Sequence, residues 1–328
     1  MMNEDSGEFF RNKRIVVTGG AGFIGSHLVD ALIPEHAKVT VFDMLEPHGL
    51  YNLRDSLTEI TYHKINMLDR EKILELMDGT DIVFHLAGNA SVPISVQNPS
   101  LDFDANVIST MNVLQALLQK RIGKVVYLSS AAVYGIPKYV PTDEEHPLKP
   151  VSPYGATKTA AETIGLTYAN AFGVDFVVGR LYSPFGPRQR RYAMFDLLNK
   201  IHHDPTHIDV LGNGTQIRDY ISIYDTARAL LTIAQYGQRG NAYNISANIP
   251  VSIRELLPLL IEVSGVKHSI NVSYSNHSWV GDLPVMMANT TKLKALGFCP
   301  RKSLITGIEE LYRWMETEVW SKELISLM

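Results

Sequence analysis

Two residues of one predicted helix could carry out acid–base chemistry. Tyr154 and Lys158 are the ends of the segment Tyr154-Gly155-Ala156-Thr157-Lys158, and a spacing of four places them on one face of a helix. A lysine ammonium beside a phenol favours the phenolate, so we expect the pKa of Tyr154 to fall from about 10 toward neutrality. Such a group could take the proton of an alcohol that loses a hydride. Alone the pair is weak evidence, because an exposed helix often carries one by chance.

Two hydroxyl side chains, Ser129 and Ser130, directly follow the apolar run at residues 124–128. If that run is a buried parallel strand, both hydroxyls lie at the carboxyl end of the sheet. Ligands bind at this end in open α/β folds. The sequence therefore predicts that the two serines face a ligand.

A glycine-rich segment joins the first predicted strand to the first predicted helix and contains Gly19, Gly22 and Gly25. Glycines there allow a tight turn, close approach of a pyrophosphate to the backbone, and packing of the helix on the strand. The helix N-terminus then offers unpaired amides to the phosphates. Asp43 ends the second predicted strand, where a carboxylate binds the adenosine ribose and repels a 2′-phosphate. We therefore predict NAD rather than NADP; the alternative is that Asp43 only opens a turn.

The elements that must position these residues alternate along the first half of the chain. Short β-branched runs are separated by amphipathic segments of helical length, which is typical of a parallel sheet covered on both faces. The predicted strands are residues 14–17, 38–42, 60–64, 81–86, 124–128 and 175–179. The predicted helices between them are residues 23–32, 70–77, 104–119 and 154–172. The fold class is therefore α/β, a Rossmann-type doubly wound parallel sheet.

The pattern changes after Arg180, where prolines and an arginine run interrupt the alternation. Residues 208–211 and 243–245 are predicted as isolated strands, and helices are predicted near residues 224–234, 252–263 and 306–318. We expect a smaller, partly interleaved C-terminal substrate lobe. The predicted domains are an NAD-binding domain at 12–180, with returns near 219–248, and a nucleotide-sugar-binding lobe at 181–218 and 249–328.

Composition and charge exclude several classes of protein. The 328 residues carry a net charge of −4, which excludes a nucleic-acid binder that relies on bulk positive charge. The single cysteine, Cys299, excludes an internal disulfide framework. The N-terminus has no secretory signal, and no stretch approaches the length of a membrane span. We expect a cytoplasmic protein with no membrane partner.

A metal site is the alternative interpretation of His202, His203 and His207. Their spacing could place two of them on one helical face. Pro205, however, interrupts a helix between them, and the predicted chemistry requires no metal. We therefore predict a surface cluster of histidines and no bound metal.

Taken together, these motifs resemble the extended short-chain dehydrogenase/reductase family, and within it the NAD-dependent nucleotide-sugar epimerase/dehydratase group. The resemblance covers about residues 12–318. Its matching pieces are residues 18–25, 85–88, Asn106, 129–135, 152–158, 186–190, 212–220 and 281–284. Members of the group usually pair as homodimers through two helices of each subunit, which here correspond to residues 104–119 and 154–172.

The resemblance also implies roles for individual residues. Tyr154, Lys158 and Ser130 correspond to the catalytic group, with Ser130 bonding the reacting sugar oxygen. The implied NAD contacts are Gly19, Gly22, Phe23, Ile24, Asp43, Asn66, Met67, Leu86, Ala87, Asn106, Tyr154 and Lys158. The implied contacts to the nucleotide sugar are Ser130, Ser183, Arg190, Arg218, Asp282 and Met286.

Two positions depart from the family pattern. Ser183 stands where the family usually has asparagine, and Trp279 stands where many members have a second arginine for the pyrophosphate. Arg218 matches the first arginine of that pair, a suitable bidentate partner for phosphate. Arg188, Arg190 and His277 are the candidates to replace the missing one.

The reaction is predicted from the two residues after Ser130. In 4,6-dehydratases the resemblance places an aspartate and a glutamate there, and decarboxylating members keep the glutamate. This chain has Ala131 and Ala132, which carry no group for proton transfer. Epimerisation at C4 needs no further acid or base. The alternatives are a nucleotide-sugar dehydratase or reductase that uses another base, and a non-catalytic NAD-binding regulator.

The sugar is predicted from Met286, which the resemblance places near the C2 substituent. A large aromatic residue there favours a plain hexose, whereas a small one admits an N-acetyl group. Methionine is intermediate in bulk and flexible. We therefore expect a UDP-hexose, with UDP-glucose and UDP-galactose first, and UDP-GlcNAc or UDP-glucuronate as alternatives.

Overall fold

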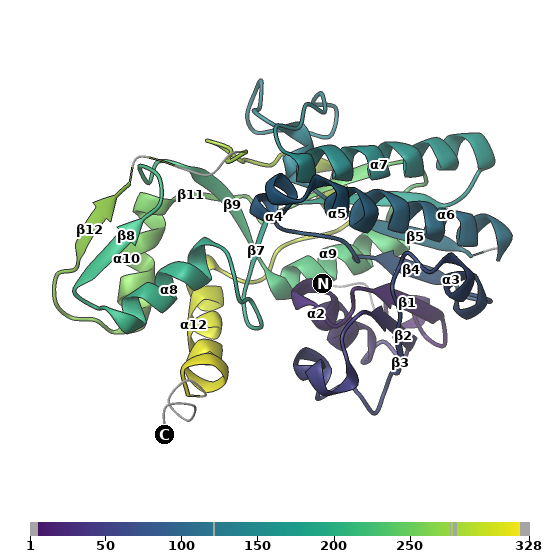
Figure 1. Cartoon of the computed structure of the whole chain (residues 1–328), viewed down its shortest axis with the longest axis horizontal. Coiled ribbons are helices and arrows are strands. Elements are labelled where there is room, and N and C mark those ends of the chain that lie inside the picture. The colour runs from purple at the N-terminus through teal and green to yellow at the C-terminus, as the bar shows by residue number, and fades with distance from the viewer. Residues whose placement is uncertain (1–5, 121, 276, 278–280, 322–328) are drawn as a thin grey trace.

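The computed structural model describes residues 6–120, 122–275, 277 and 281–321. Figure 1 shows a larger lobe, built mainly from the first half of the chain, and a smaller lobe beside it. Trp279, which replaces a family arginine, lies outside the described residues. Among the described residues, no helix is long and apolar enough to cross a membrane.

The larger lobe contains a seven-stranded sheet in which every neighbouring pair is parallel. Its strand order is β3-β2-β1-β4-β5-β6-β10. The order reverses between β1 and β4, and this reversal creates a crevice at the carboxyl ends of the strands. The strands are β1 (Arg14–Thr18), β2 (Lys38–Asp43), β3 (Thr61–Lys64), β4 (Ile82–His85), β5 (Lys124–Ser130), β6 (Phe176–Leu181) and β10 (Ala242–Ile245). The predicted Rossmann-type fold is confirmed.

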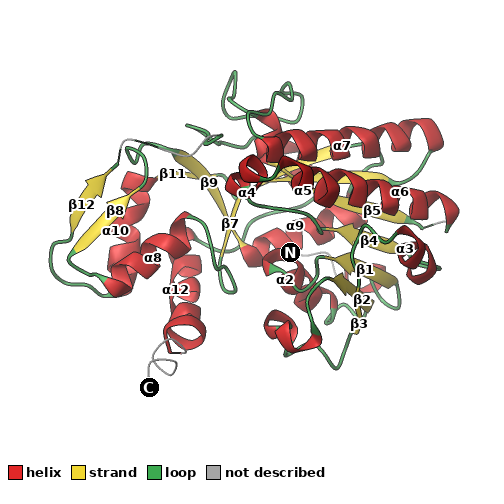
Figure 2. Ribbon diagram, viewed as in Figure 1, coloured by secondary structure: helices red, strands yellow, loops and turns green. Residues whose placement is uncertain are grey.

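Helices cover both faces of this sheet (Figure 2). One face packs against α2 (Phe23–Leu32), α9 (Ile223–Tyr236) and α11 (Thr291–Ala295), which contribute Leu28, Leu230 and Leu293 to one apolar cluster. The other face packs against α3 (Arg70–Leu76), α6 (Ser109–Gln119) and α7 (Pro153–Phe172). The central strands are buried on both faces, which explains their continuous apolar runs, whereas the edge strand β3 is partly exposed.

The smaller lobe has a separate apolar core. Its three-stranded sheet has the order β11-β9-β7, and a second sheet pairs β8 with β12 in parallel. The strands are β7 (Ser183–Phe185), β8 (His207–Val210), β9 (Ile217–Ser222), β11 (Ile249–Ser252) and β12 (Asn271–Tyr274). The helices that pack on them are α8 (Ala193–His203), α10 (Ile253–Ser264) and α12 (Leu304–Met315).

Short helices fill the connections between these elements. The α-helical ones are α1 (Ser6–Phe9), α4 (Val92–Gln97) and α5 (Pro99–Phe103). The 3₁₀ and π turns are η1 (Pro47–Gly49), η2 (Tyr51–Leu53), η3 (Asp104–Ile108), η4 (Ala131–Tyr134) and η5 (Glu316–Trp320). Of these, α4, α5 and η3 pack against α7 and support the helix that carries Tyr154.

Three predicted elements differ from the structure. Residues 243–245 are not isolated, because β10 pairs with β6 at the edge of the main sheet. Residues 208–211 are not isolated either, since β8 pairs with β12. The predicted helix at 104–119 begins with the π turn η3 before α6. These differences reflect long-range pairing and packing, which local periodicity does not encode.

Candidate active site

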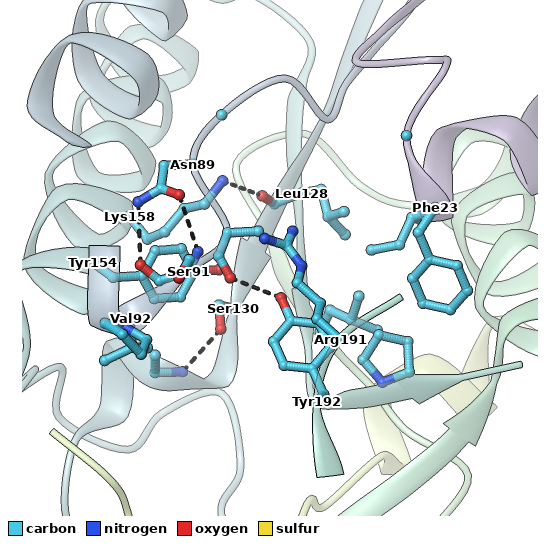
Figure 3. A pocket seen from close by; sticks show the side chains of 18 of the residues that line it. Phe23, Asn89, Ser91, Val92, Leu128, Ser130, Tyr154, Lys158, Arg191 and Tyr192 are labelled. Atoms are coloured by element: carbon cyan, nitrogen blue, oxygen red, sulfur yellow. Dashed lines mark hydrogen bonds between the residues drawn. The ribbon is translucent and has the colours of Figure 1, made fainter. Parts of the chain in front are cut away.

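The carboxyl ends of the parallel strands open into a cavity of about 1670 Å³ that both lobes line. Figure 3 shows part of it, with Tyr154 and Lys158 on one side and Phe23 on the other. The cavity brings together the predicted residues Gly19, Gly22, Phe23, Ile24, Asp43, Asn66, Met67, Leu86, Ala87, Ser130, Tyr154, Lys158, Ser183, Arg218, Asp282 and Met286. Asn106 and Arg190 do not line it.

The glycine segment forms a close backbone cradle at one end of the cavity. A Cβ atom on Gly19 would lie 2.9 Å from the amide nitrogen of Ala87, and one on Gly25 would lie 2.2 Å from the carbonyl oxygen of Gly19. Gly22 caps α2 without a side-chain hydrogen bond. The first amides of α2 are therefore open to a phosphate group. These residues fit the pyrophosphate of a dinucleotide.

Asp43 lies at the end of β2 and lines the same cavity. Its Oδ2 accepts a hydrogen bond of 3.0 Å from the amide of Ala21, and its Oδ1 accepts one of 2.8 Å from the amide of Met44. These two bonds fix the carboxylate beside the glycine cradle. This position is compatible with binding of the adenosine ribose. The bond to Met44 shows that Asp43 also stabilises the turn after β2, which was the alternative role.

Asn106 lies behind the cavity wall. Its side chain is buried, and its Nδ2 donates a hydrogen bond of 3.1 Å to Oγ1 of Thr157. A Cβ atom on Gly88, a residue of the wall, would lie 2.3 Å from Asn106 Oδ1. The asparagine therefore packs against the back of the wall and positions it.

Tyr154 and Lys158 are fixed by the start of α7. Ser152 caps the helix through the amide of Gly155, and Ser95 of α4 accepts a hydrogen bond of 3.0 Å from the amide of Tyr154. The Lys158 ammonium donates a hydrogen bond of 3.0 Å to the carbonyl oxygen of Leu128. The two side chains therefore face the cavity from a helix that is anchored at both the strand and the preceding helix.

The charge states of this pair differ from the prediction. Burial raises the pKa of Tyr154, whereas a hydrogen bond with Ser130 and the charge of Arg191 oppose the rise. Burial also lowers the pKa of Lys158 to about 8, and Asp102 partly offsets this effect. The predicted fall in the pKa of Tyr154 through Lys158 is therefore wrong for the protein alone, because desolvation outweighs the nearby charges.

Ser130 ends β5 and meets Tyr154 at the cavity wall. Its Oγ accepts a hydrogen bond of 3.2 Å from the amide of Ala132, at the first turn of η4. Ala132 lines the cavity, and Ala131 is buried behind it. The wall next to Ser130 therefore presents the methyl group of Ala132 and no carboxylate from this segment.

The residues that were predicted to contact the nucleotide sugar and that line the cavity come from the chain beyond Arg180, except Ser130. Arg218 and Asp282 form an ion pair at the wall, and Arg218 also donates a hydrogen bond of 2.7 Å to the carbonyl oxygen of Leu283. Ser183 on β7 and Met286 after the Asp282 segment line the same cavity. The structure thus holds Arg218 in a fixed orientation.

The arginine run at 188–191 divides among three places. Arg188 forms an ion pair of 2.7 Å with Asp30 of α2. The Arg190 guanidinium lies 5.3 Å from the ring centroid of Trp314, outside the cavity. Arg191 instead lines the cavity. His277, the third candidate for the missing family arginine, is exposed.

Two further side chains of the wall were missed by the sequence analysis. Tyr192 donates a hydrogen bond of 2.8 Å from its hydroxyl to the carbonyl oxygen of Ala90, across the cavity (Figure 3). Asn89 donates one of 2.6 Å to Oδ1 of Asp102. No periodic pattern marks these residues. The only sequence signal was the arginine run that precedes Tyr192. In the structure Tyr192 has a positive φ of 77°, which changes the direction of the backbone there.

The three histidines that raised the metal alternative have different partners. His202 stacks on Trp320 with ring centroids 4.0 Å apart, and His207 pairs with Asp209 at 3.0 Å. Nδ1 of His203 lies 2.8 Å from a backbone carbonyl oxygen of its own helix. Within the described part of the chain, no three His, Cys, Asp or Glu side chains form a group that could hold a metal.

A parallel sheet with an open glycine cradle, followed by a buried tyrosine and lysine on one helix, defines an NAD-dependent enzyme of the short-chain dehydrogenase/reductase class. Comparison with known proteins refines this class. The chain belongs to the NAD dependent epimerase/dehydratase family, whose family model matches residues 15–246. Its cofactor is NAD.

Named relatives include both epimerases and dehydratases. The chain is 31% identical over 310 residues to a putative UDP-glucose 4-epimerase of Methanocaldococcus jannaschii, covering 92% of this chain and 98% of the relative. It is 32% identical over 311 residues to a dTDP-glucose 4,6-dehydratase of an Actinoplanes species, covering 92% and 97%.

A solved structure is similar over nearly the whole fold. It is a variant UDP-glucuronic acid 4-epimerase from Bacillus cereus, in complex with UDP-4-deoxy-4-fluoro-glucuronic acid and NAD. The TM-score is 0.87 and the identity 26%, with 93% of this chain and 99% of the other covered. The protein is therefore an enzyme of the family that acts on nucleotide sugars.

Proposed function

We propose that this enzyme inverts the configuration at C4 of a UDP-hexose, through a transient 4-keto sugar. The observation that carries the proposal is the wall beside Ser130. Ala131 and Ala132 occupy the positions at which the dehydratases of the family have an acid and a base, and Ala132 lines the cavity. Elimination of water requires a base that removes a proton from one carbon and an acid that protonates the hydroxyl leaving the next carbon. Epimerisation requires proton transfer only at the C4 hydroxyl.

The composition of the cavity wall supports the same choice. Among the described residues that line it there is no glutamate. Its aspartates lie on β2, on η3, in the smaller lobe or beside Arg218: Asp43, Asp104, Asp196, Asp209 and Asp282. None of them belongs to the segment β5–η4 that carries Ser130. A general acid for elimination would have to come from another element.

The catalytic roles follow from the positions of three side chains. Bound NAD supplies a hydride acceptor and, when reduced, a hydride donor. Tyr154 takes the proton of the C4 hydroxyl as that carbon is oxidised. After the keto sugar has rotated in the site and its other face is reduced, Tyr154 returns the proton to the oxygen. Ser130, which lines the cavity together with Tyr154, holds the reacting oxygen. Lys158 keeps a positive charge behind Tyr154 and favours the phenolate.

The smaller lobe supplies the nucleotide-binding side of the proposed site. We assign residues 12–180, with returns near 219–248, to NAD binding, and residues 181–218 and 249–328 to the nucleotide sugar. Arg218, held by Asp282, binds the pyrophosphate, and Ser183 and Met286 contact the sugar. The orientation of Arg218 supports this role because a fixed guanidinium loses little entropy when it binds phosphate.

Arg191 favours a second candidate substrate, a UDP-hexuronate. Its guanidinium lines the cavity and acts electrostatically on Tyr154. A carboxylate at C6 of a sugar whose C4 hydroxyl meets Tyr154 would find a cation there. The similar Bacillus cereus structure contains a UDP-uronic acid analogue, which supports the same class of ligand.

We further propose that the enzyme is a cytoplasmic homodimer. The segment 104–119 carries a stripe of exposed and half-buried apolar side chains at helical spacing, namely Ile108, Met111 and Leu118. The neighbouring α7 carries a parallel stripe with Ile164, Tyr168 and Phe172. Two such stripes on adjacent helices support a four-helix interface.

The proposed reaction is tested by incubating the NAD-loaded enzyme with a panel of UDP-, dTDP- and GDP-sugars. NMR of the products, with absorbance of NADH followed in parallel, separates the alternatives. We expect inversion at C4 of UDP-glucose, UDP-galactose or UDP-glucuronate with no net change in NADH. A 4-keto-6-deoxy or pentose product would contradict the proposal, and net oxidation of NADH would identify a reductase.

A further inference from the structure

Asp102 is a buried carboxylate that the proposed mechanism does not use. It lies on α5, is 0% exposed and does not line the cavity. Its Oδ1 accepts the hydrogen bond from Nδ2 of Asn89 at 2.6 Å, and its Oδ2 accepts one from Oγ1 of Thr157. Both donors are neutral, so the negative charge has polar partners but no bound counter-charge.

The position of Asp102 relates it to the two catalytic side chains. Thr157, its hydrogen-bond donor, directly precedes Lys158 on α7. Among the described residues, no cation lies within ion-pair distance of Asp102. A buried charge without such a pair is costly and persists only where its surroundings or its function require it. The charge of Asp102 affects two side chains of α7: it raises the pKa of Lys158 and that of Tyr154.

Other titratable groups face α7, and most of those in the interior are neutral or paired. Glu162 of α7 is paired with Arg180 of β6, and Lys124 of β5 is paired with Asp175. Burial keeps His85, Tyr127 and Tyr134 neutral, with the pKa of His85 lowered to about 3 and those of both tyrosines raised. The remaining neighbours are at the open side of the cavity, namely Asp104, Arg191 and Tyr192.

We propose that Asp102 is a positioning residue whose buried negative charge keeps the Lys158 ammonium protonated behind Tyr154, without touching substrate or cofactor. This inference rests on the proposed roles of Tyr154 and Lys158. Its physical basis is that burial of an ammonium favours the neutral amine, and a fixed anion at the back of the helix opposes that loss of charge.

The sign of the effect follows for both groups. Asp102 raises the pKa of Lys158 and also raises the pKa of Tyr154. Removing its charge lowers both values. Since activity requires Tyr154 deprotonated and Lys158 protonated, both limbs of a bell-shaped pH profile move to lower pH, whichever limb belongs to which group.

The decisive variant is Asp102→Asn, which removes the charge and keeps the shape. The amide oxygen can accept the bond from Asn89, and the amide NH₂ can donate to the Thr157 hydroxyl. Replacing a buried charge by a neutral isostere often leaves stability unchanged or increases it. We therefore expect Asp102→Asn to melt at the same or a higher temperature than the parent enzyme.

The matched control is Thr157→Val, which removes a hydrogen bond to Asp102 and leaves the charge. Thr157 is buried and does not line the cavity. We expect this variant to melt at a lower temperature because a polar network loses a member. The limbs of its pH profile should stay where they are in the parent enzyme.

Two measurements are made on each NAD-loaded protein. The first is the pH profile of kcat and KM for the substrate found in the panel. The second needs no substrate: tyrosinate absorbance is titrated, and the contribution of Tyr154 among the 15 tyrosines is isolated by subtracting the Tyr154→Phe form of the same protein. If no sugar in the panel reacts, the proposed function fails, while this titration still tests Asp102.

We expect Asp102→Asn to move both limbs, and the Tyr154 midpoint, to lower pH by about 0.5 unit or more, with KM within about twofold. If the pH profile and the Tyr154 midpoint of Asp102→Asn are the same as in the parent enzyme, the proposal is overturned. Equal shifts in Thr157→Val would overturn it as well, because the hydrogen bond and not the charge would then be responsible. Failure of Asp102→Asn to fold would assign the carboxylate to structure alone and also overturn it.

Discussion

The ammonium group of Lys158 donates a 3.0 Å hydrogen bond to the carbonyl oxygen of Leu128. This bond connects the second turn of α7 to the end of β5, because Leu128 lies two residues before Ser130. It also fixes the position of the positive charge at the cavity wall, with Nζ of Lys158 5.0 Å from the ring centroid of Tyr127. Because the described hydrogen bond of the ammonium goes to Leu128 and not to Tyr154, the effect of the lysine on the phenol in the proposed mechanism is electrostatic.

Turnover is predicted to rise with pH up to about 8 and then to level off. Activity requires Tyr154 deprotonated, and burial raises its pKa, so the active fraction grows as the pH rises. Burial lowers the pKa of Lys158 to about 8, so above that pH the loss of the lysine charge offsets the gain in phenolate. Lys158→Arg, whose guanidinium stays protonated, should continue to rise above pH 8 in whatever activity it retains. Initial rates between pH 6 and 10 measure the effect, and a parent profile that keeps rising up to pH 9.5 would contradict the prediction.

Tyr154→Phe is predicted to lower turnover by about 10²-fold or more, the lower end of the effect of general acid–base catalysis. The phenyl ring keeps the packing of this buried position, so the variant should fold and bind NAD as the parent does. Calorimetric titration with NAD provides that control. Turnover within tenfold of the parent enzyme would remove Tyr154 from the proposed mechanism.

Asp43→Ala is predicted to weaken NAD binding and to relax discrimination against NADP. The variant loses the carboxylate that faces the cavity together with its bonds to the amides of Ala21 and Met44. Asp43→Asn separates these effects, because its side-chain oxygen can still accept a bond from the loop while the charge that repels a 2′-phosphate is gone. Calorimetry with both cofactors measures selectivity. Unchanged selectivity in both variants would leave Asp43 only its role in the turn.

Tyr192→Phe is predicted to raise the KM for the nucleotide sugar by several-fold, with a smaller change in kcat. The hydroxyl bond to the Ala90 carbonyl connects the loop that carries Arg191 to the loop after β4, and the variant frees that end of the loop. The free energy of unfolding should change by only about 1 kcal/mol. Tyr236→Phe, at an exposed tyrosine of α9, is the matched control. Equal KM values in the two variants would show that the bond does not hold the substrate wall.

Leu118→Asp is predicted to dissociate the proposed dimer. Leu118 is 40% exposed on α6, so the change leaves the core of the subunit intact but places a charge in the four-helix interface. Leu57→Asp, at a leucine with the same 40% exposure elsewhere, is the control. Sedimentation should give a dimer for the parent and control proteins and a monomer for Leu118→Asp. A monomeric parent protein at micromolar concentration would contradict the proposed assembly.

Much of the fold could be predicted from local sequence. The glycine segment, the apolar runs and the Tyr154–Lys158 spacing are set by backbone geometry over a few residues, and each of them lies where it was expected. A strand or a helical face leaves a short repeat in the sequence because neighbouring side chains alternate or return at fixed intervals. These repeats also place Gly19, Asp43 and Ser130 at one edge of the sheet.

The tertiary structure alone decided which distant groups meet. Among the three arginines of residues 188–191, Arg191 lines the cavity while Arg188 and Arg190 contact Asp30 and Trp314. No repeat distinguishes these three positions, because the loop between β7 and α8 has irregular backbone angles. Partner choice there depends on how the two lobes pack.

The charge state of Tyr154 was likewise outside the reach of sequence. Spacing identified its neighbour Lys158, but the pKa of Tyr154 depends on how completely water is removed and on charges from other elements, among them Asp102 and Arg191. Burial and long-range electrostatics are properties of the packed chain and leave no local pattern. The sequence by itself therefore determined which residues could react, and the packing of α5, α7 and the smaller lobe decided the electrostatic surroundings in which they do so.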